Sequence, residues 1–335
     1  HRLFGTPVGL RPPSVPNSRT KHQTNGRTLL MKCPAIGVRS MSVLGDRLNL
    51  LLRHQHLGPI TDLSVDPAGK MASLARDKSA GLVVRRLDNG TVLGEIPDQA
   101  YEACRFDAGR CHLWCAARIN RHEIKCELLD APSLRILCQA IIPDDFGDSG
   151  CIFSPAPQPD AMGLWLTDCQ ASRLLWLACG PSGLSWRVEP LVEDAYPPVF
   201  NDSGTEFLVN HGDMVRRYAY PAVQLLNTCP CTFDEEAFEP SLCYLSGKTA
   251  LVRSSNGRLF TINLETMALG EEALISGHEP KPARAFSSLQ RDARLCTDID
   301  TFQRLGRYVV MVCPPEGHSS HGDSLLFCHI EEFSS

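Results

Sequence analysis

The chain has 335 residues, of which 43% are hydrophobic and 21% are charged, and its formal net charge is −5 at neutral pH. This composition is typical of a globular protein with a large apolar core. The longest aliphatic run, Leu48-Asn49-Leu50-Leu51-Leu52, is far shorter than the roughly 20 residues that a membrane helix needs. The sequence therefore predicts no membrane partner, and no apolar segment of the secretory-signal type follows the basic N-terminus.

Basic side chains are concentrated at the N-terminal end of the chain. Residues 1–45 contain seven of the 33 Lys and Arg residues and no acid, so the remaining residues carry a net charge of −12. A basic arm on an acidic body is typical of a nucleic-acid contact, a partner-binding tail, a transit-peptide remnant or a solvated terminus. We expect residues 1–24 to form this arm, with nucleic acid as an alternative partner.

The fifteen cysteines are scattered along the chain and odd in number. Many of them lie inside apolar runs, namely Cys104, Cys115, Cys126, Cys243, Cys313 and Cys328. Buried free thiols pack as small hydrophobic groups. We therefore expect reduced cysteines and an intracellular compartment (cytoplasmic or nuclear, with mitochondrial as an alternative) rather than a disulfide framework.

A turn signal followed by an apolar run recurs along the chain at a spacing of about 43 residues. The seven signals are Asn25-Gly26, Asp66-Pro67-Ala68-Gly69, Asp107-Ala108-Gly109, Gln158-Pro159-Asp160, Asn201-Asp202-Ser203-Gly204, Leu245-Ser246-Gly247 and Arg304-Leu305-Gly306. In the clearest unit, Gln55–Pro97, turn formers separate four short β-type runs. Long helical stripes are absent from the sequence. We predict an all-β fold, a seven-bladed β-propeller with four-stranded antiparallel blades.

We expect one propeller domain over residues 1–335. The predicted blades cover residues 25–57, 58–98, 99–146, 147–193, 194–232, 233–276 and 277–335. The last unit ends after its third strand, Ser324–Glu331, so its outer strand is missing. We predict that the N-terminal segment Leu3–Leu10 supplies this strand, which would close the ring and cover an exposed edge.

One unit resembles the WD-repeat family in its motifs. The segment His56-Leu57-Gly58-Pro59-Ile60-Thr61, followed by Asp66-Pro67-Ala68-Gly69, is similar to the family's His loop, inner strand and turn. Gly277-His278 gives a second match, whereas no Trp-Asp dipeptide occurs and Arg85-Arg86 stands where one is expected. The resemblance implies that His56 and Asp77 keep part of a structural hydrogen-bond network in the turns. Propellers outside the WD-repeat family stay an alternative.

The predicted topology brings two classes of loop to one face of the disc. These are the loop between the second and third strands of each blade and the loop that enters the next blade. The residues that we expect on this face, as a partner-binding surface, are Lys78, Arg118, Arg121, His122, Gln170, His211, Asp213, Asn256, His318 and His321. Their mixture of polar and basic groups is suited to the rim of a protein interface.

Three clusters have residue types that bind metals, but each has a simpler explanation. His54 and His56 alternate onto one face of an extended segment without a third ligand at suitable spacing. Cys229-Pro230-Cys231 lacks a second cysteine pair, which a metal site would need. Cys111 and Cys115 lie on a predicted strand and are expected to pack in the core. We predict no metal and no cofactor.

Candidates for catalysis are weak as well. The loop from His318 to Asp323 holds His, Ser and Asp, but neighbours in sequence do not form a catalytic triad by themselves. The pair Asp144-Asp145 falls between units, where solvated charge is the default. Thr61-Asp62 and Thr297-Asp298-Ile299-Asp300 are the obvious acidic segments of the inner strands.

These observations favour a non-catalytic scaffold that binds protein partners within a larger intracellular complex. A rigid ring with many loops is well suited to recognition without chemistry. The alternatives are a propeller enzyme that acts on a small molecule at the central channel and a nucleic-acid-associated scaffold that uses the basic arm.

Overall fold

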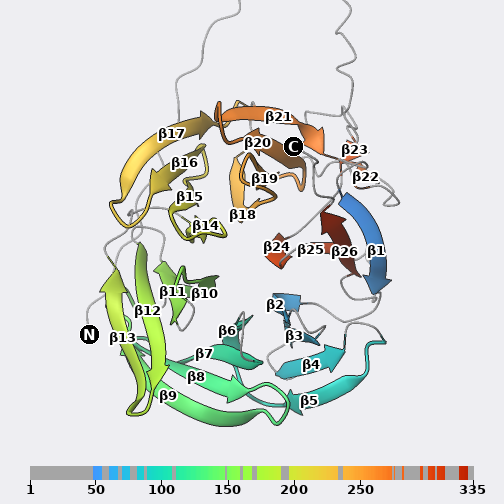
Figure 1. Ribbon diagram of the computed structural model, residues 1–335. Helices are drawn as coiled ribbons and strands as arrows, with labels where there is room; N and C mark the ends of the chain where they lie inside the picture. Colours follow the sequence, from blue (N-terminus) through green and yellow to red (C-terminus); the bar gives the residue numbers. More distant parts are fainter. Residues whose placement is uncertain are drawn as a thin grey trace, which may run out of the picture. The chain divides into compact units, whose positions relative to one another are not determined.

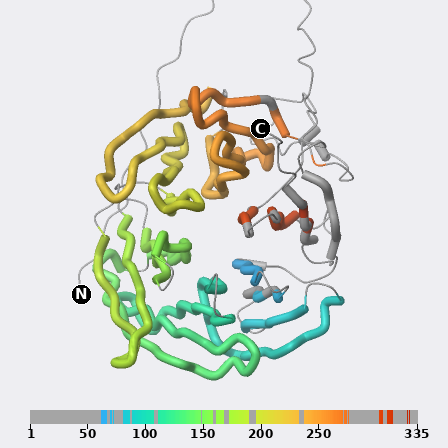
Figure 2. The backbone as a smooth tube through the Cα atoms, in the orientation of Figure 1, coloured from blue at the N-terminus to red at the C-terminus, as the bar shows by residue number. Residues whose placement is uncertain are grey.

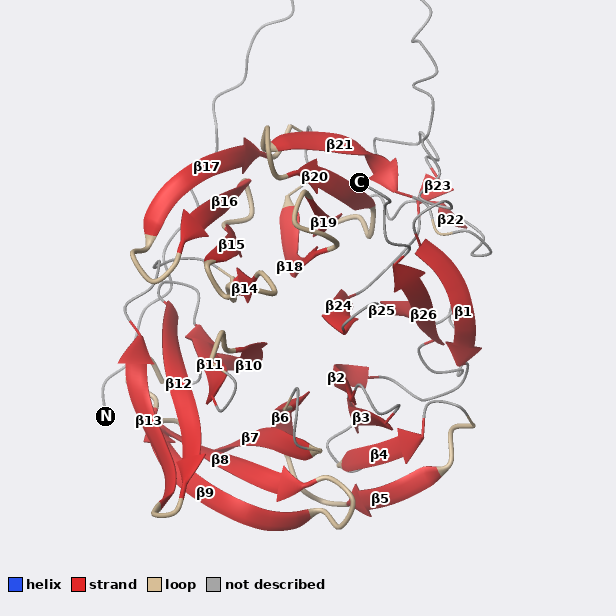
Figure 3. Cartoon of the chain, viewed as in Figure 1, coloured by secondary structure: helices blue, strands red, loops and turns tan. Residues whose placement is uncertain are grey.

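The computed structural model describes residues 48–54, 60–66, 70–75, 81–86, 89–107, 111–147, 149–158, 161–167, 172–189, 196–232, 237–273, 275, 281–282, 295–296, 301–305, 308–313 and 324–330. All of them lie in one compact unit, residues 41–335. Every regular element in the described part is a strand (Figure 3). In that part we find no helix of the length and hydrophobicity that crossing a membrane requires.

The strands form six four-stranded antiparallel sheets. The first three sheets consist of β2 (Ile60–Asp66), β3 (Lys70–Ala75), β4 (Leu82–Arg86) and β5 (Val92–Ile96); β6 (Tyr101–Phe106), β7 (His112–Asn120), β8 (Glu123–Asp130) and β9 (Arg135–Pro143); and β10 (Gly150–Pro155), β11 (Ala161–Thr167), β12 (Ser172–Gly180) and β13 (Gly183–Glu189). In each, consecutive strands pair as a meander, so the first strand is innermost and the fourth is outermost.

The second three sheets follow the same order with one exception. They consist of β14 (Val199–Phe200), β15 (Glu206–Asn210), β16 (Met214–Ala219) and β17 (Gln224–Pro230); β18 (Phe238–Tyr244), β19 (Thr249–Ser254), β20 (Leu259–Asn263) and β21 (Ala268–Ala273); and β24 (Thr301–Leu305), β25 (Tyr308–Cys313), β26 (Ser324–Ile330) and β1 (Leu48–His54). A small hairpin, β22 (Lys281–Pro282) with β23 (Leu295–Cys296), precedes the last sheet.

The six sheets stand in a ring (Figures 1 and 2). The inner strands contact one another in the cyclic order β2, β6, β10, β14, β18 and β24, and β24 contacts β2 again. The apolar core lies between neighbouring sheets rather than inside one of them. One cluster, for example, joins Trp114 and Ile124 of sheet β6–β9 to Leu164 and Leu175 of sheet β10–β13. The predicted all-β fold of four-stranded antiparallel sheets is confirmed.

The prediction that Leu3–Leu10 is the closing strand of the ring was wrong. The outer neighbour of β26 is β1, Leu48–His54, which pairs with it in antiparallel register. This position is therefore not available to Leu3–Leu10, which lies outside the described residues. Leu48–His54 is the better strand by sequence because it is a nearly continuous aliphatic run, whereas Leu3–Leu10 contains Gly5 and Pro7.

The predicted count of seven blades is not confirmed, because the described residues form six four-stranded sheets. Five of these lie within the predicted units from residue 58 to residue 276. The predicted first unit, 25–57, contributes one described element, β1, and this strand belongs to the last sheet. The two ends of the chain were thus counted as separate units although one strand joins them. The extent of the predicted single domain, 1–335, stays a prediction.

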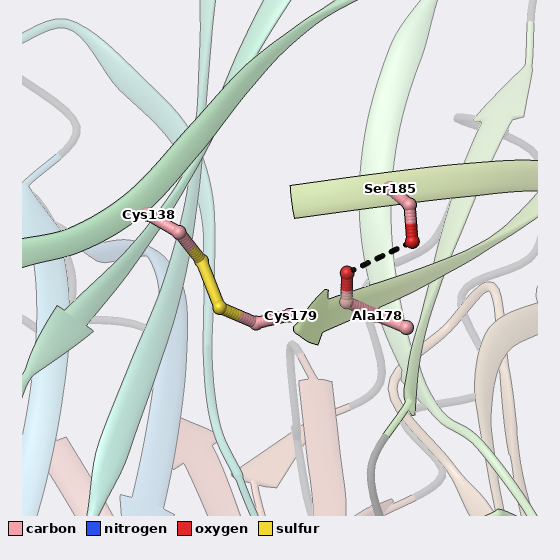
Figure 4. The surroundings of a disulfide bond; sticks show 4 residues. All are labelled: Cys138, Ala178, Cys179 and Ser185. Carbon is pink, nitrogen blue, oxygen red and sulfur yellow. Dashed lines mark hydrogen bonds between the residues drawn. A yellow bond between two sulfur atoms is a disulfide. The ribbon is translucent and has the colours of Figure 1, made fainter. Parts of the chain in front are cut away.

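Cysteine pairing departs from the expectation of reduced thiols at one place. Cys138 of β9 and Cys179 of β12 form a disulfide between neighbouring sheets, with their Cα atoms 6.8 Å apart (Figure 4). The other ten cysteines with described side chains are free, and most of them are buried. Cys115 packs in the core as predicted, whereas Cys111 is exposed just before β7, so the expectation for Cys111 was wrong.

We expect reduction of the Cys138–Cys179 disulfide to lower the free energy of unfolding by about 2–4 kcal/mol, because the bond closes a loop of 41 residues in the unfolded chain. Urea denaturation with and without reductant measures the change. The Cys179→Ala variant is the control, since its stability should no longer respond to reductant. An equal response of both proteins would contradict the pairing.

Candidate functional site

The centre of the ring encloses a cavity of about 720 Å³. All six inner strands line it, together with the turns between the first and second strands of three sheets. Its polar lining residues include Asp62, Ser64, Glu102, Arg105, Asn201, Asp202, Ser241, Gln303 and Arg304. Because these turns belong to one end of the ring, the cavity reaches the end opposite to the turns between second and third strands.

A chain of polar contacts crosses this cavity between four sheets. The guanidinium group of Arg105 on β6 donates to the carbonyl of Phe153 on β10, at 3.0 Å, and to the Gln303 side chain on β24. Gln303 Nε2 in turn donates to the carbonyl of Leu63 on β2 at 2.9 Å. Asp62 Oδ2 accepts the backbone N–H of Cys104 on β6 at 2.8 Å. These bonds join the first three sheets and the last.

Further side chains of the inner strands, and one of β15, also bridge junctions of the ring. Ser64 accepts the N–H of Phe106 at 2.9 Å, and Ser154 donates to the carbonyl of Pro198 at 2.6 Å. Ser241 accepts the N–H of Phe302 at 3.3 Å. Asn210 Nδ2 donates to the carbonyl of Glu239, which connects sheet β14–β17 to sheet β18–β21. At each of the six junctions, at least one hydrogen bond therefore ties a side chain to the backbone of the neighbouring sheet.

The cavity holds groups whose protonation is shifted by burial. Desolvation raises the pKa of Asp62, although the charge of Arg105 and the N–H groups of Cys104 and Leu63 act in the opposite direction. Desolvation lowers the pKa of Arg105, opposed by the charge of Asp62. Burial also raises the pKa of the Cys151 thiol well above its ordinary value, so this cysteine is a poor nucleophile at neutral pH.

Metal binding has no support in the described part of the chain. There, no three His, Cys, Asp or Glu side chains are grouped so that they could hold an ion. Cys229 is buried, and Cys231 is half-buried. His56 lies outside the described residues, so the candidate pair with His54 stays a prediction.

Sequence reasoning named Asp62 among the inner acids but missed Glu102, Arg105, Gln303 and Arg304. The available signal was the position of Glu102 and Arg105 inside the short inner run Tyr101–Phe106. A charged residue in such a run has to find a partner across the channel or the junction. Asp298 and Asp300 lie outside the described residues.

The turns between second and third strands are bonded to the loops that enter the next sheet, as the predicted topology requires. Asp144 N–H donates to the carbonyl of His122 at 2.8 Å, and Cys231 N–H donates to the carbonyl of Asp213 at 2.7 Å. Phe238 N–H donates to the carbonyl of Gly212 at 2.6 Å. The two classes of loop therefore share one end of the ring, which we call the entry face.

Arg118, one of the residues that we expected on the partner-binding surface, is instead largely buried in a polar network. Its guanidinium group lies 2.9 Å from Asp144 and 3.5 Å from Glu102, and it also donates to the carbonyl of Ser149. The expectation of solvated charge at Asp144 was wrong for the same reason. Burial alone would raise the pKa of Asp144, but hydrogen bonds from Arg118 and Ser149 outweigh it and lower the pKa.

The other expected surface residues fall into two groups. Arg121 and His122 are exposed in the β7–β8 turn, Asp213 is exposed in the β15–β16 turn, and His211 and Asn256 are half-buried in their turns. The remaining expected residues, Lys78, Gln170, His318 and His321, lie outside the described part, as do His56 and Asp77 of the expected turn network. The role of these positions in partner binding stays a prediction.

We expect Asp62→Ala to lower the free energy of unfolding by about 1–3 kcal/mol, because it leaves the backbone N–H of Cys104 without its acceptor. The raised pKa of Asp62 favours its protonated form in the folded chain. The stabilisation of the folded chain that this raised pKa gives is therefore fully present below the ordinary carboxyl pKa. It is lost as pH rises through the pKa of Asp62 in the folded chain. Urea midpoints across pH should show this component in the wild type and not in the variant.

Glu95→Ala, at an exposed position of β5, is the matched control and should change stability by less than about 0.5 kcal/mol. Equal stability of Asp62→Ala and the wild type at every pH would contradict the role of Asp62 in joining the sheets.

Comparison with known proteins identifies the fold of this chain but not its family. A solved structure similar to this chain is the β-propeller domain of Cps50 (Swd1) from Myceliophteria thermophila, with a TM-score of 0.55 and 12% sequence identity. The similarity covers 82% of this chain and 99% of that domain. No family model and no curated protein sequence matches the chain. The likeness confirms the β-propeller fold, and membership of the WD-repeat family stays a prediction.

Proposed function

We propose that this chain is a non-catalytic scaffold that binds a protein partner through the entry face, as a subunit of an intracellular complex. The observation that carries the proposal is the way in which the entry face is built. Exposed polar side chains are presented there by turns that hydrogen bonds hold to a closed ring. Such an arrangement provides a fixed pattern of donors, acceptors and charges without a moving part.

Side-chain caps fix the turns of the entry face. Asn120 Oδ1 accepts the backbone N–H of His122 at 2.8 Å, and Asn210 Oδ1 accepts that of Gly212 at 2.7 Å. These are the local bonds by which Asn stabilises a tight turn. Ser255 N–H donates to the carbonyl of Ala237 at 2.9 Å, which ties a third turn to the loop that enters the same sheet. Binding of a partner would thus cost little conformational entropy, because the turns of this surface are already ordered.

Exposed groups on the entry face are of mixed charge. Arg121, His122 and Asp213 come from two turns, and all three are exposed. Interfaces between proteins that also exist apart are rimmed by such polar groups. The chemistry of the face therefore fits a protein partner with complementary polar groups.

The contacts of the central cavity support a scaffold over the enzyme alternative. Both carboxylate oxygens of Asp62 accept backbone N–H groups, from Leu63 and Cys104. Arg105 bonds Gln303 and the Phe153 carbonyl, and Arg304 bonds Asp202 and the Tyr244 carbonyl. These charged groups are engaged in holding sheets together. A catalytic acid or base needs access to a proton on the substrate.

The nucleic-acid alternative depends on the basic arm, residues 1–24, which lies outside the described residues. It stays a prediction, as does the intracellular location.

Affinity purification of the tagged chain followed by mass spectrometry tests the proposal. We expect the double variant Arg121→Glu, Asp213→Lys to recover about tenfold less of the partners that the wild type enriches, because it reverses charges on the entry face. The control is Lys248→Glu, which reverses an exposed charge in the β18–β19 turn at the opposite end of the ring. Undiminished recovery by the double variant, or equal losses in both variants, would sink the proposal.

A further inference from the structure

Each sheet of the ring has an outer edge at the perimeter, and among the described residues no further strand is hydrogen-bonded to it (Figure 1). A free edge presents a row of N–H and C=O groups that can pair with a strand from another chain. Proteins commonly protect such edges with bulges, prolines or charges. The six outer strands of the described residues are β1, β5, β9, β13, β17 and β21.

Five of these outer strands are protected by a bulge, because their register with the adjacent strand shifts by one residue. The unpaired residues include Leu93, Leu137 and Leu226. Each of them forms a consecutive exposed apolar pair with the residue before it, as in Leu225-Leu226. Most of the exposed apolar side chains on the perimeter are therefore explained by bulges.

β13 differs from the other outer strands. Its register with β12 runs without interruption through seven pairs, from Leu174↔Glu189 to Gly180↔Gly183. It contains no proline, and its two charges, Arg187 and Glu189, neutralise each other at 2.9 Å. By contrast, β9 and β17 end in proline and β21 contains two glutamates. β13 is thus a regular edge that lacks the common protective features.

The β12–β13 hairpin determines which backbone groups of β13 face outward. Its turn has two residues, so the tight-turn hydrogen bond joins Gly180 and Gly183. Bonded and non-bonded positions alternate along an antiparallel pair. The N–H and C=O groups of Gly183, Ser185 and Arg187 therefore face β12. Those of Leu184, Trp186 and Val188 face outward, away from the sheet.

The same three residues have their side chains on one face of β13. Leu184 is half-buried against the cluster that contains Cys179, whereas Trp186 and Val188 are 39% and 45% exposed. Exposed apolar groups that alternate on a regular edge strand are what a pairing strand needs, since its own alternate residues would cover them.

We propose that two copies of this chain associate by antiparallel pairing of their β13 edges. A twofold axis at Trp186 places Trp186 opposite Trp186 of the second copy and Leu184 opposite Val188. All three residues use their outward N–H and C=O groups in this register, so six backbone hydrogen bonds form. An interface of this kind is self-complementary, as a twofold dimer requires.

Charges agree with this register as well. Arg187 stands opposite Ser185 of the second copy, and Glu189 stands opposite Gly183, so no like charges face each other directly. The two Arg187 side chains become diagonal neighbours, but each is neutralised by its own Glu189. A register centred on Arg187 would instead place the two arginines opposite each other.

Sedimentation velocity of the full chain at about 1–100 µM tests the pairing. The wild type should show a reversible monomer–dimer equilibrium. Trp186→Lys places two like charges on the axis and should raise the dissociation constant by about tenfold or more. Val188→Pro should do the same, because it removes an outward N–H while leaving the bonds to β12 in place.

Leu226→Lys is the matched control, since Leu226 has a similar exposed fraction of 45% but lies in the bulge of β17. It should leave the dissociation constant unchanged, and unchanged thermal midpoints identify the variants that fold normally. A wild type that stays monomeric throughout would overturn the proposal. So would a dimer that is insensitive to both β13 variants, or one that Leu226→Lys weakens equally.

Discussion

The structure depends on a constraint that each four-stranded sheet imposes on the next. A sheet with apolar residues on both faces is stable when neighbours cover both faces, and in a row of sheets the two end faces would stay exposed. Closing the row into a ring removes these end faces. Leu164 and Leu175 cover one neighbour, while Trp165 and Trp176 of the same sheet pack toward Phe200 of the next. Burial between sheets thus requires the ring to be complete.

Hydrogen bonds at the inner strands set the geometry of this closure. Asp62, Arg105 and Gln303 connect the first three sheets and the last, and serine or asparagine side chains connect the others. A buried polar group is costly unless it is bonded, so these side chains favour one arrangement of the sheets over a less ordered one. The hydrogen bonds between sheets also engage the charged side chains Asp62 and Arg105 of the channel. The surfaces left for recognition are the turns at the two ends and the outer edges.

The period of about 43 residues located the sheets from β2 to β21 because each sheet is built from one continuous segment. Closure could not be predicted in the same way. It joins β1 to β26 across almost the whole chain, and nothing in a local pattern identifies that partner. Sequence reasoning chose Leu3–Leu10 because it precedes the first predicted unit and the last unit lacked an outer strand, although Leu48–His54 is the stronger strand former.

Side-chain roles were harder to predict than strands, because they depend on neighbours distant in sequence. Arg118 and Asp144 each lie in a polar stretch that is typical of exposed loops, but 26 residues apart in sequence they form an ion pair. Cys138 and Cys179 each look like a core thiol, and only the stacking of two sheets brings them together. The regular edge of β13 is likewise visible only from the pairing register, since the bulges of the other outer strands leave no local sequence signal.

The central claim is that the six sheets form one closed body in which β1 is the closing strand. Hydrogen–deuterium exchange of the chain with and without residues 48–54 tests it most directly. We expect removal of β1 to reduce amide protection in β26 and also in β2 and in sheet β14–β17 on the far side of the ring, because all of them unfold together. Loss of protection confined to β26 would contradict the closed ring.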